Sequence, residues 1–292
     1  MRKRIIALLI ALLICVPCLA AAETLVTSFY PIWLFTRSLT DGLPVTVENL
    51  TAPDTGCLHD YQLQTADMRK LAEADAFLIN GAGMEVFLPV ITEALPDLPV
   101  VDASVGIPLL ENDESAEFGS SEEGEYDAHL WLDGNRAMQM ITNLAEGLIR
   151  LLPQYEEQIR ANLDAALLRM EEMNRTLTET LSALPRKQII TFHEAFPYFG
   201  EAYGLEVIAV GEEVSPSQMA RLAELISSMG KPPLFTEPQF ENLTARILAA
   251  DTGASLYQLD PIVTGPEEDV PLDYYETVML QNMETLCEAL GD

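Results

Sequence analysis

The 292-residue chain contains three histidines, and these are the residues best suited to chemistry. His59, His129 and His193 lie 70 and 64 residues apart, and Asp260 follows 67 residues after the last of them. Imidazole nitrogens and a carboxylate form a borderline N/O ligand set, which suits Zn²⁺ in tetrahedral geometry. The spacing alone is weak support, because it matches neither a zinc finger nor an HExxH metalloprotease.

Each of these four residues follows a predicted β-strand or the loop after one. Short apolar runs predict strands at residues 45–50, 99–103, 188–192 and 255–259, which precede His59, His129, His193 and Asp260 in that order. Ligands of open α/β sheets gather beyond the carboxyl ends of the strands. We therefore expect the four side chains to face one another across a cleft, two from each half of the chain.

The elements that must position these residues form a repeated α/β pattern. Continuous apolar strand runs alternate with helical patterns in both halves, as is typical of parallel sheets covered on both faces. Between the halves, apolar residues recur every three or four positions, which predicts one helix over residues 153–184. At 1.5 Å per residue such a helix is about 48 Å long, so we expect it to lie against both halves.

The predicted fold class is therefore α/β. It consists of two Rossmann-like lobes with parallel sheets, residues 23–152 and 185–292, joined by one long rigid α-helix at 153–184, with the metal site in the cleft between the lobes. A coiled-coil dimer through the long helix is the competing interpretation. Its polar face does not follow a heptad pattern and the chain has one such helix, so we expect a monomer.

The charge of the chain excludes some partners. With 46 acidic and 16 basic residues the net charge is −30, which argues against nucleic acid or an anionic membrane surface as a partner. Residues 111–127, the acidic loop, hold eight carboxylates and no basic residue, which predicts a mobile loop. Either the loop raises the local concentration of cations near the site, or it is a solvated segment that only connects its neighbouring elements.

The first 22 residues have the pattern of a signal peptide. Arg2, Lys3 and Arg4 precede an apolar run over residues 5–19 and three alanines at 20–22. We expect an exported, periplasmic or cell-surface protein. Ile14 and Pro17 stand before the two signal cysteines, where a lipoprotein needs a small residue, so a soluble form is favoured over a lipid-anchored one.

The segments around the candidate ligands resemble a known family, the metal-binding receptors of zinc and manganese ABC importers, whose lobes are joined by a rigid helix. The resemblance runs in order from residue 24 to the end of the chain. It is carried by five segments: APDTGCLHDYQLQTAD (52–67), DAHLWLD (127–133), TFHEAFPYF (191–199), FTEPQF (235–240) and LDP (259–261).

The resemblance implies that the metal ligands are His59, His129, His193 and Asp260. Members that favour manganese carry a carboxylate at the position of His193, so the histidine here indicates Zn²⁺ as the transported ligand, with Mn²⁺ as an alternative.

Two positions depart from the family pattern. Gly134 replaces a proline, and Cys57 replaces an aspartate two residues before the first ligand. Cys57 is interpreted as a spare thiolate ligand, as a disulfide partner of Cys287, or as an inert residue.

The function implied by the resemblance is that of a binding protein, not an enzyme, which captures Zn²⁺ outside the cytoplasm and delivers it to the membrane permease of an ABC importer. A receptor for manganese or another divalent metal is the first alternative. A zinc-dependent hydrolase is the second, with Glu194 beside His193 as its candidate base, although Asp260 would occupy the coordination position that water needs. A receptor for a chelated metal or corrinoid is the third. A role in cell adhesion is a further alternative, since some surface-attached relatives are adhesins.

Overall fold

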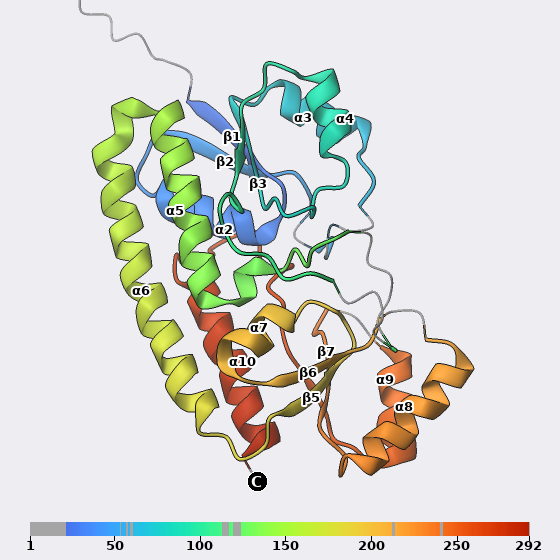
Figure 1. Ribbon diagram of the computed structural model, residues 1–292. Helices are drawn as coiled ribbons and strands as arrows, with labels where there is room; N and C mark the ends of the chain where they lie inside the picture. Colours follow the sequence, from blue (N-terminus) through green and yellow to red (C-terminus); the bar gives the residue numbers. More distant parts are fainter. Residues whose placement is uncertain are drawn as a thin grey trace, which may run out of the picture.

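The computed structural model describes residues 22–52, 54–56, 58, 61–112, 117–118, 124–211, 214–239 and 242–291 (Figure 1). Several predictions concern positions outside these ranges. They are the ligand His59, the roles of Cys57, the signal segment apart from Ala22, and residues 113–116 and 119–123 of the acidic loop.

The first half of the chain forms a four-stranded parallel sheet in the order β2-β1-β3-β4. Its core is formed by apolar strand residues such as Leu25, Val26, Phe77 and Leu78, which are at most 1% exposed. The elements of this half are β1 (Glu23–Thr27), α2 (Tyr30–Leu39), β2 (Val45–Asn49), α3 (Thr65–Ala72), β3 (Ala76–Ile79), α4 (Leu88–Ala94) and β4 (Val100–Asp102).

The second half repeats this topology in a sheet of order β6-β5-β7-β8, also parallel throughout. Local signals set its helix ends: Ser215 and Gln218 form a capping box at the start of α8, and Gly253 ends α9 in the left-handed conformation. The elements are β5 (Gln188–Thr191), α7 (Pro197–Tyr203), β6 (Glu206–Ala209), α8 (Pro216–Ser228), β7 (Leu234–Thr236), α9 (Leu243–Thr252), β8 (Leu256–Gln258) and α10 (Tyr274–Leu290).

A helical layer joins the two sheets along one side of the molecule (Figure 1). It contains α5 (Gly134–Leu151) and α6 (Glu156–Ser182), which are separated by a 3-10 turn at Pro153–Tyr155. Helix α6 contacts α2 and α5 in the first half and α7 and α10 in the second half. The expected α/β fold, with two parallel-sheet lobes joined by a long helix, is therefore confirmed.

One apolar core extends through both halves of the chain. It includes Phe77 of β3, Met170 and Leu177 of α6, Phe199 of α7 and Leu286 of α10. A second core lies between the second sheet and α8 and α9, with Ile190, Leu222 and Leu248 among its members. Because the larger core is continuous across α6, the packing favours a fixed relation between the lobes over a wide hinge.

Two described residues of the acidic loop, Glu117 and Phe118, contact the second half of the chain. Phe118 is 7% exposed and belongs to the second core, and its carbonyl accepts a hydrogen bond from Gly211 N at 2.8 Å. Glu117 forms an ion pair with Arg221 of α8, with a Nε–Oε1 distance of 2.6 Å. Both contacts come from segments about one hundred residues away, so no local sequence pattern predicts them.

Gly134 has a structural reason for replacing the family's proline. Its backbone N–H donates to the Tyr203 hydroxyl at 3.2 Å, and a proline has no such hydrogen. A Cβ at this position would also lie 2.6 Å from Asn174 Oδ1. The residue begins α5, so this contact fixes the start of the helix that follows the second candidate ligand.

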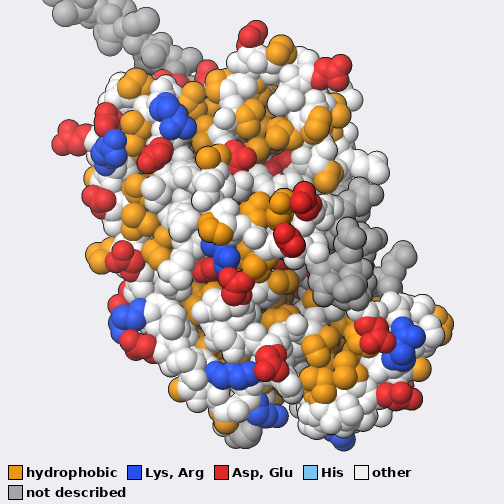
Figure 2. Space-filling view, in the orientation of Figure 1, with side chains coloured by type: hydrophobic (Ala, Val, Ile, Leu, Met, Phe, Trp, Pro, Cys, Tyr) orange, Lys and Arg blue, Asp and Glu red, His pale blue; other side chains and the backbone are white. Residues whose placement is uncertain are grey.

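Within the described ranges, no helix is long and apolar enough to cross a membrane. Asp and Glu side chains are spread over both lobes on the face shown in Figure 2.

Candidate metal centre

His129 lies between the acidic loop and the 3-10 turn Leu130–Leu132, and it is fully buried. Its Nδ1 is 2.8 Å from Asp127 Oδ1, and the same carboxylate oxygen accepts the His129 backbone N–H at 2.8 Å. Tyr198 of α7 holds this segment from the second half, because its hydroxyl donates to the Asp127 carbonyl and accepts the Leu110 N–H, each at 2.9 Å. The imidazole orientation is thus fixed by contacts from both lobes.

His193 follows β5 and is placed in a similar way. Its Nδ1 contacts Oε1 of Glu237, a buried carboxylate that follows β7. The other Glu237 oxygen accepts a hydrogen bond from Gln239 Nε2 at 2.6 Å. Strands β5 and β7 are neighbours in the sheet, so their carboxyl ends bring histidine and glutamate together.

The structure brings these two histidines to each other. Their ring centroids are 5.4 Å apart and the rings are perpendicular. Metal-binding histidines commonly pair one ring nitrogen with a carboxylate, which fixes the tautomer and raises the basicity of the other nitrogen. With Nδ1 of each ring engaged in this way, coordination would use Nε2. Asp127 and Glu237 were not among the predicted site residues, although both stand within the segments that carry the family resemblance.

Asp260 lies after β8 in a turn that its own side chain closes. Its Oδ1 accepts the Ile262 N–H at 2.7 Å. Burial raises the pKa of the Asp260 carboxyl, and the hydrogen bond from Ile262 opposes that rise. Burial and the neighbouring Tyr274 raise the pKa of Tyr30 at the start of α2, and the charge of Asp260 adds to this rise.

The remaining predicted ligand, His59, lies outside the described residues. Among the described residues, no three His, Cys, Asp or Glu side chains are close enough together to hold a metal ion. Cys287 carries a free thiol on α10. Its predicted disulfide partner, Cys57, lies outside the described residues.

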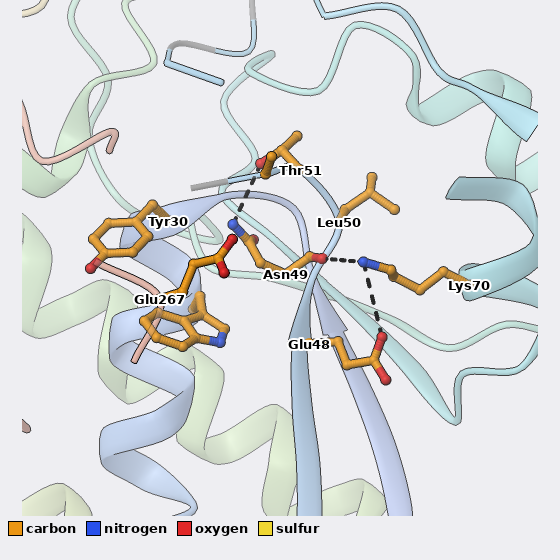
Figure 3. Close-up of a pocket in the computed structure, with 9 residues that line it drawn as sticks. Tyr30, Glu48, Asn49, Leu50, Thr51, Lys70 and Glu267 are labelled. Carbon is orange, nitrogen blue, oxygen red and sulfur yellow. Dashed lines mark hydrogen bonds and ion pairs between the residues drawn. The ribbon is translucent and has the colours of Figure 1, made fainter. Parts of the chain in front are cut away.

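A pocket of about 470 Å³ lies at the carboxyl end of β2 (Figure 3). Its wall includes the stacked rings of Tyr30 and Trp33, whose centroids are 5.3 Å apart. Lys70 Nζ donates to the Asn49 carbonyl at 2.6 Å, and Glu267 reaches the pocket from the second half of the chain. His129, His193 and Asp260 are not among the described residues that line it.

The arrangement of two carboxylate-paired imidazoles between two α/β lobes agrees with the family comparison. The sequence profile of the family described as "ZnuA: Zinc-uptake complex component A periplasmic" matches residues 25–289. The chain belongs to the ZnuA family. The match covers all four candidate ligands.

Curated relatives include metal-binding proteins of two kinds. The zinc-binding protein AdcA of Streptococcus pyogenes is 29% identical over 287 residues, which cover 89% of this chain and 55% of AdcA. The manganese-binding lipoprotein MntA of Halalkalibacterium halodurans is 27% identical over 205 residues, which cover 68% of this chain and 66% of MntA. The chain thus spans about half the length of AdcA.

Solved structures share the whole fold. A crystal structure of ZnuA has a TM-score of 0.78 and 26% identity, with 92% of this chain and 99% of that chain covered. The Zn(II)-bound ZnuA-like domain of Streptococcus pneumoniae AdcA has a TM-score of 0.80 and 25% identity, with coverage of 93% and 100%. The expected receptor fold therefore extends over nearly the full chain.

Proposed function

We propose that the chain is an extracytoplasmic solute-binding protein that captures Zn²⁺ and delivers it to the membrane permease of an ABC importer. The observation that carries the proposal is the pair of imidazoles from two lobes, 5.4 Å apart, each paired with a carboxylate. Its membership of the ZnuA family, the zinc-binding relative AdcA and the Zn(II)-bound ZnuA-like domain support the same conclusion.

The proposed ligands of a single Zn²⁺ are His59, His129, His193 and Asp260. Three imidazoles favour Zn²⁺ over Mn²⁺, because Mn²⁺ prefers carboxylate, carbonyl and water oxygens. Mn²⁺ remains the alternative cargo, since the relative MntA is described as manganese-binding. In this proposal residues 1–22 are a signal peptide, 23–152 and 185–292 are the two lobes, and 153–184 is the linking helix.

The proposal includes no enzymatic activity. Three histidines and an aspartate complete a tetrahedral zinc site, whereas a catalytic zinc site keeps one position for water. The receptor is proposed to act as a monomer in the periplasm or at the cell surface, with the metal ion and the permease as its partners.

The test is anaerobic elemental analysis of protein purified without added metal, followed by competition with a calibrated zinc chelator. We expect about one zinc per chain, with tight binding lost in His129→Ala and His193→Ala and zinc affinity lowered in Asp260→Asn. Asp102→Asn is a matched control, because Asp102 Oδ1 accepts the Ser104 N–H at 2.7 Å in the same kind of turn. The same samples should show no esterase or peptidase turnover.

Tight zinc binding that survives the histidine variants would contradict the ligand assignment. Zinc-dependent hydrolysis that disappears in the same variants would instead support the hydrolase.

A further inference from the structure

The main chain of Asp260 is held by one buried side chain of α10. Asn282 is 3% exposed. Its Oδ1 accepts the Asp260 N–H at 2.8 Å, and its Nδ2 donates to the Asp260 carbonyl at 2.8 Å. Both ends of the amide therefore bind the same residue, which fixes the peptide planes on either side of the Asp260 Cα and hence the direction of its side chain.

A second buried side chain connects the next residue to His129. Trp131 Nε1 donates to the Pro261 carbonyl at 2.7 Å. The ring of the same tryptophan packs against the His129 ring, with centroids 5.2 Å apart and an interplanar angle of 52°. Trp131 thus contacts one proposed ligand directly and the neighbour of another.

Helix α10 supports both connections. Tyr275, seven residues before Asn282 and on the same face of the helix, donates from its hydroxyl to the Trp131 carbonyl at 2.5 Å. Tyr275 and Trp131 are both at most 3% exposed. Segments 129–131, 260–262 and 275–282 therefore form one buried hydrogen-bonded network.

We propose that Asn282 and Trp131 are positioning residues of the metal centre, which fix the main chain at Asp260 relative to His129 before the metal arrives. The inference rests on the proposed function. Its physical reason is preorganisation: a ligand that is already ordered loses less conformational entropy when the metal binds. Partners in the outer shell of metal sites are typically worth about 10- to 100-fold in metal affinity.

The structure offers a matched control for the asparagine. Asn143 of α5 also donates to main-chain carbonyls, those of Ala103 and Val105, at 2.8 and 2.9 Å. It supports an ordinary loop after β4. Removing either amide costs two hydrogen bonds to the main chain, but only Asn282 holds a proposed ligand.

The experiment compares Asn282→Leu, Trp131→Phe and Asn143→Leu in the full chain. Zinc affinity is measured by chelator competition, with the thermal stability of the metal-free protein measured in parallel. We expect Asn282→Leu to weaken zinc binding by about 10- to 100-fold. Trp131→Phe keeps a ring against His129 and removes the Nε1 donor, so it should weaken binding less, and Asn143→Leu should leave the affinity unchanged.

A spectroscopic measurement separates positioning from general stability. Co²⁺ placed in the zinc site has visible absorption bands that report its ligands and geometry. The Co²⁺ spectrum of Asn282→Leu should shift toward that of Asp260→Asn, while the spectrum of Asn143→Leu stays that of the unsubstituted protein. If Asn282→Leu does not fold, the same comparison is made with Trp131→Phe.

Unchanged affinity and an unchanged Co²⁺ spectrum in both variants, with zinc affinity still lowered in Asp260→Asn, would overturn this inference and leave the proposed function standing. If Asp260→Asn itself binds zinc normally, the ligand assignment fails and this inference fails with it. If the unsubstituted chain binds no zinc, the proposed function is wrong.

Discussion

The buried carboxyl of Glu85 should make the folded protein less stable as pH rises. The side chain is 5% exposed, Oε1 accepts the Asn80 N–H at 2.8 Å, and Oε2 accepts the Gly81 N–H at 3.0 Å. Burial raises the pKa of the Glu85 carboxyl from 4.5 to about 7, against the opposing effect of these hydrogen bonds. The turn that it closes is next to the site, because Asn80 Nδ2 donates to the Ala128 carbonyl at 2.9 Å.

The sign follows from proton linkage. Because the folded-state pKa of Glu85 lies above the unfolded value, the native state binds more protons between these two pH values. The free energy of unfolding therefore falls as pH rises through this window. At 1.36 kcal/mol for each pH unit, the difference between 4.5 and 7 corresponds to about 3 kcal/mol.

The assay is urea unfolding of the metal-free protein from pH 4.5 to pH 8, comparing Glu85→Gln with the unsubstituted chain. Glutamine keeps an acceptor oxygen and does not titrate, so the variant should lack this loss of about 3 kcal/mol. Glu93→Gln, an exposed change on α4, is the control and should follow the unsubstituted chain. Parallel stability curves for Glu85→Gln and the unsubstituted chain would refute the reasoning.

Three further predictions concern the site and the acidic loop. Asp127→Asn and Glu237→Gln should each weaken zinc binding by about 10- to 100-fold in chelator competition, because the paired imidazoles lose their carboxylate partners. Phe118→Ala should lower the free energy of unfolding by about 3 kcal/mol in urea titrations, whereas Tyr126→Ala in the same loop should change it by less than about 1 kcal/mol. Replacing the six acidic-loop carboxylates other than Glu117 and Asp127 with Ser or Asn should slow zinc association in stopped-flow measurements at low salt. The difference should disappear at high salt, since exposed charges are screened beyond about 10 Å at 0.1 M ionic strength.

Many of the strands and helices can be predicted from local sequence patterns. The apolar strand runs and the capping signals around residues 215–230 predicted elements that the structure places within a few residues. Helix α5 was not predicted, although Ala137, Ile141, Leu144 and Leu148 line its buried face at helical spacing. The apolar spacing that predicts a helix is therefore present in α5 as well as in α6.

The supporting residues of the site could be predicted less well, because they depend on which strands and helices become neighbours. Asp127 stands two residues before His129, so that pair is local. Glu237 reaches His193 across 44 residues because β7 lies beside β5 in the sheet, and Asn282 reaches Asp260 because α10 folds back on the end of β8. Neither of these two contacts can be predicted from the spacing of the residues in the sequence.

The central claim is a single zinc centre of three imidazoles and one carboxylate, and X-ray absorption spectroscopy at the zinc edge tests it most directly. The account predicts one zinc per chain with N/O ligands at about 2.0–2.1 Å and the multiple-scattering pattern of three imidazoles. In Asp260→Asn the oxygen contribution should change while the imidazole pattern remains. A sulfur ligand at about 2.3 Å would identify Cys57 or Cys287 as a ligand, and fewer than three imidazoles would contradict the proposed centre.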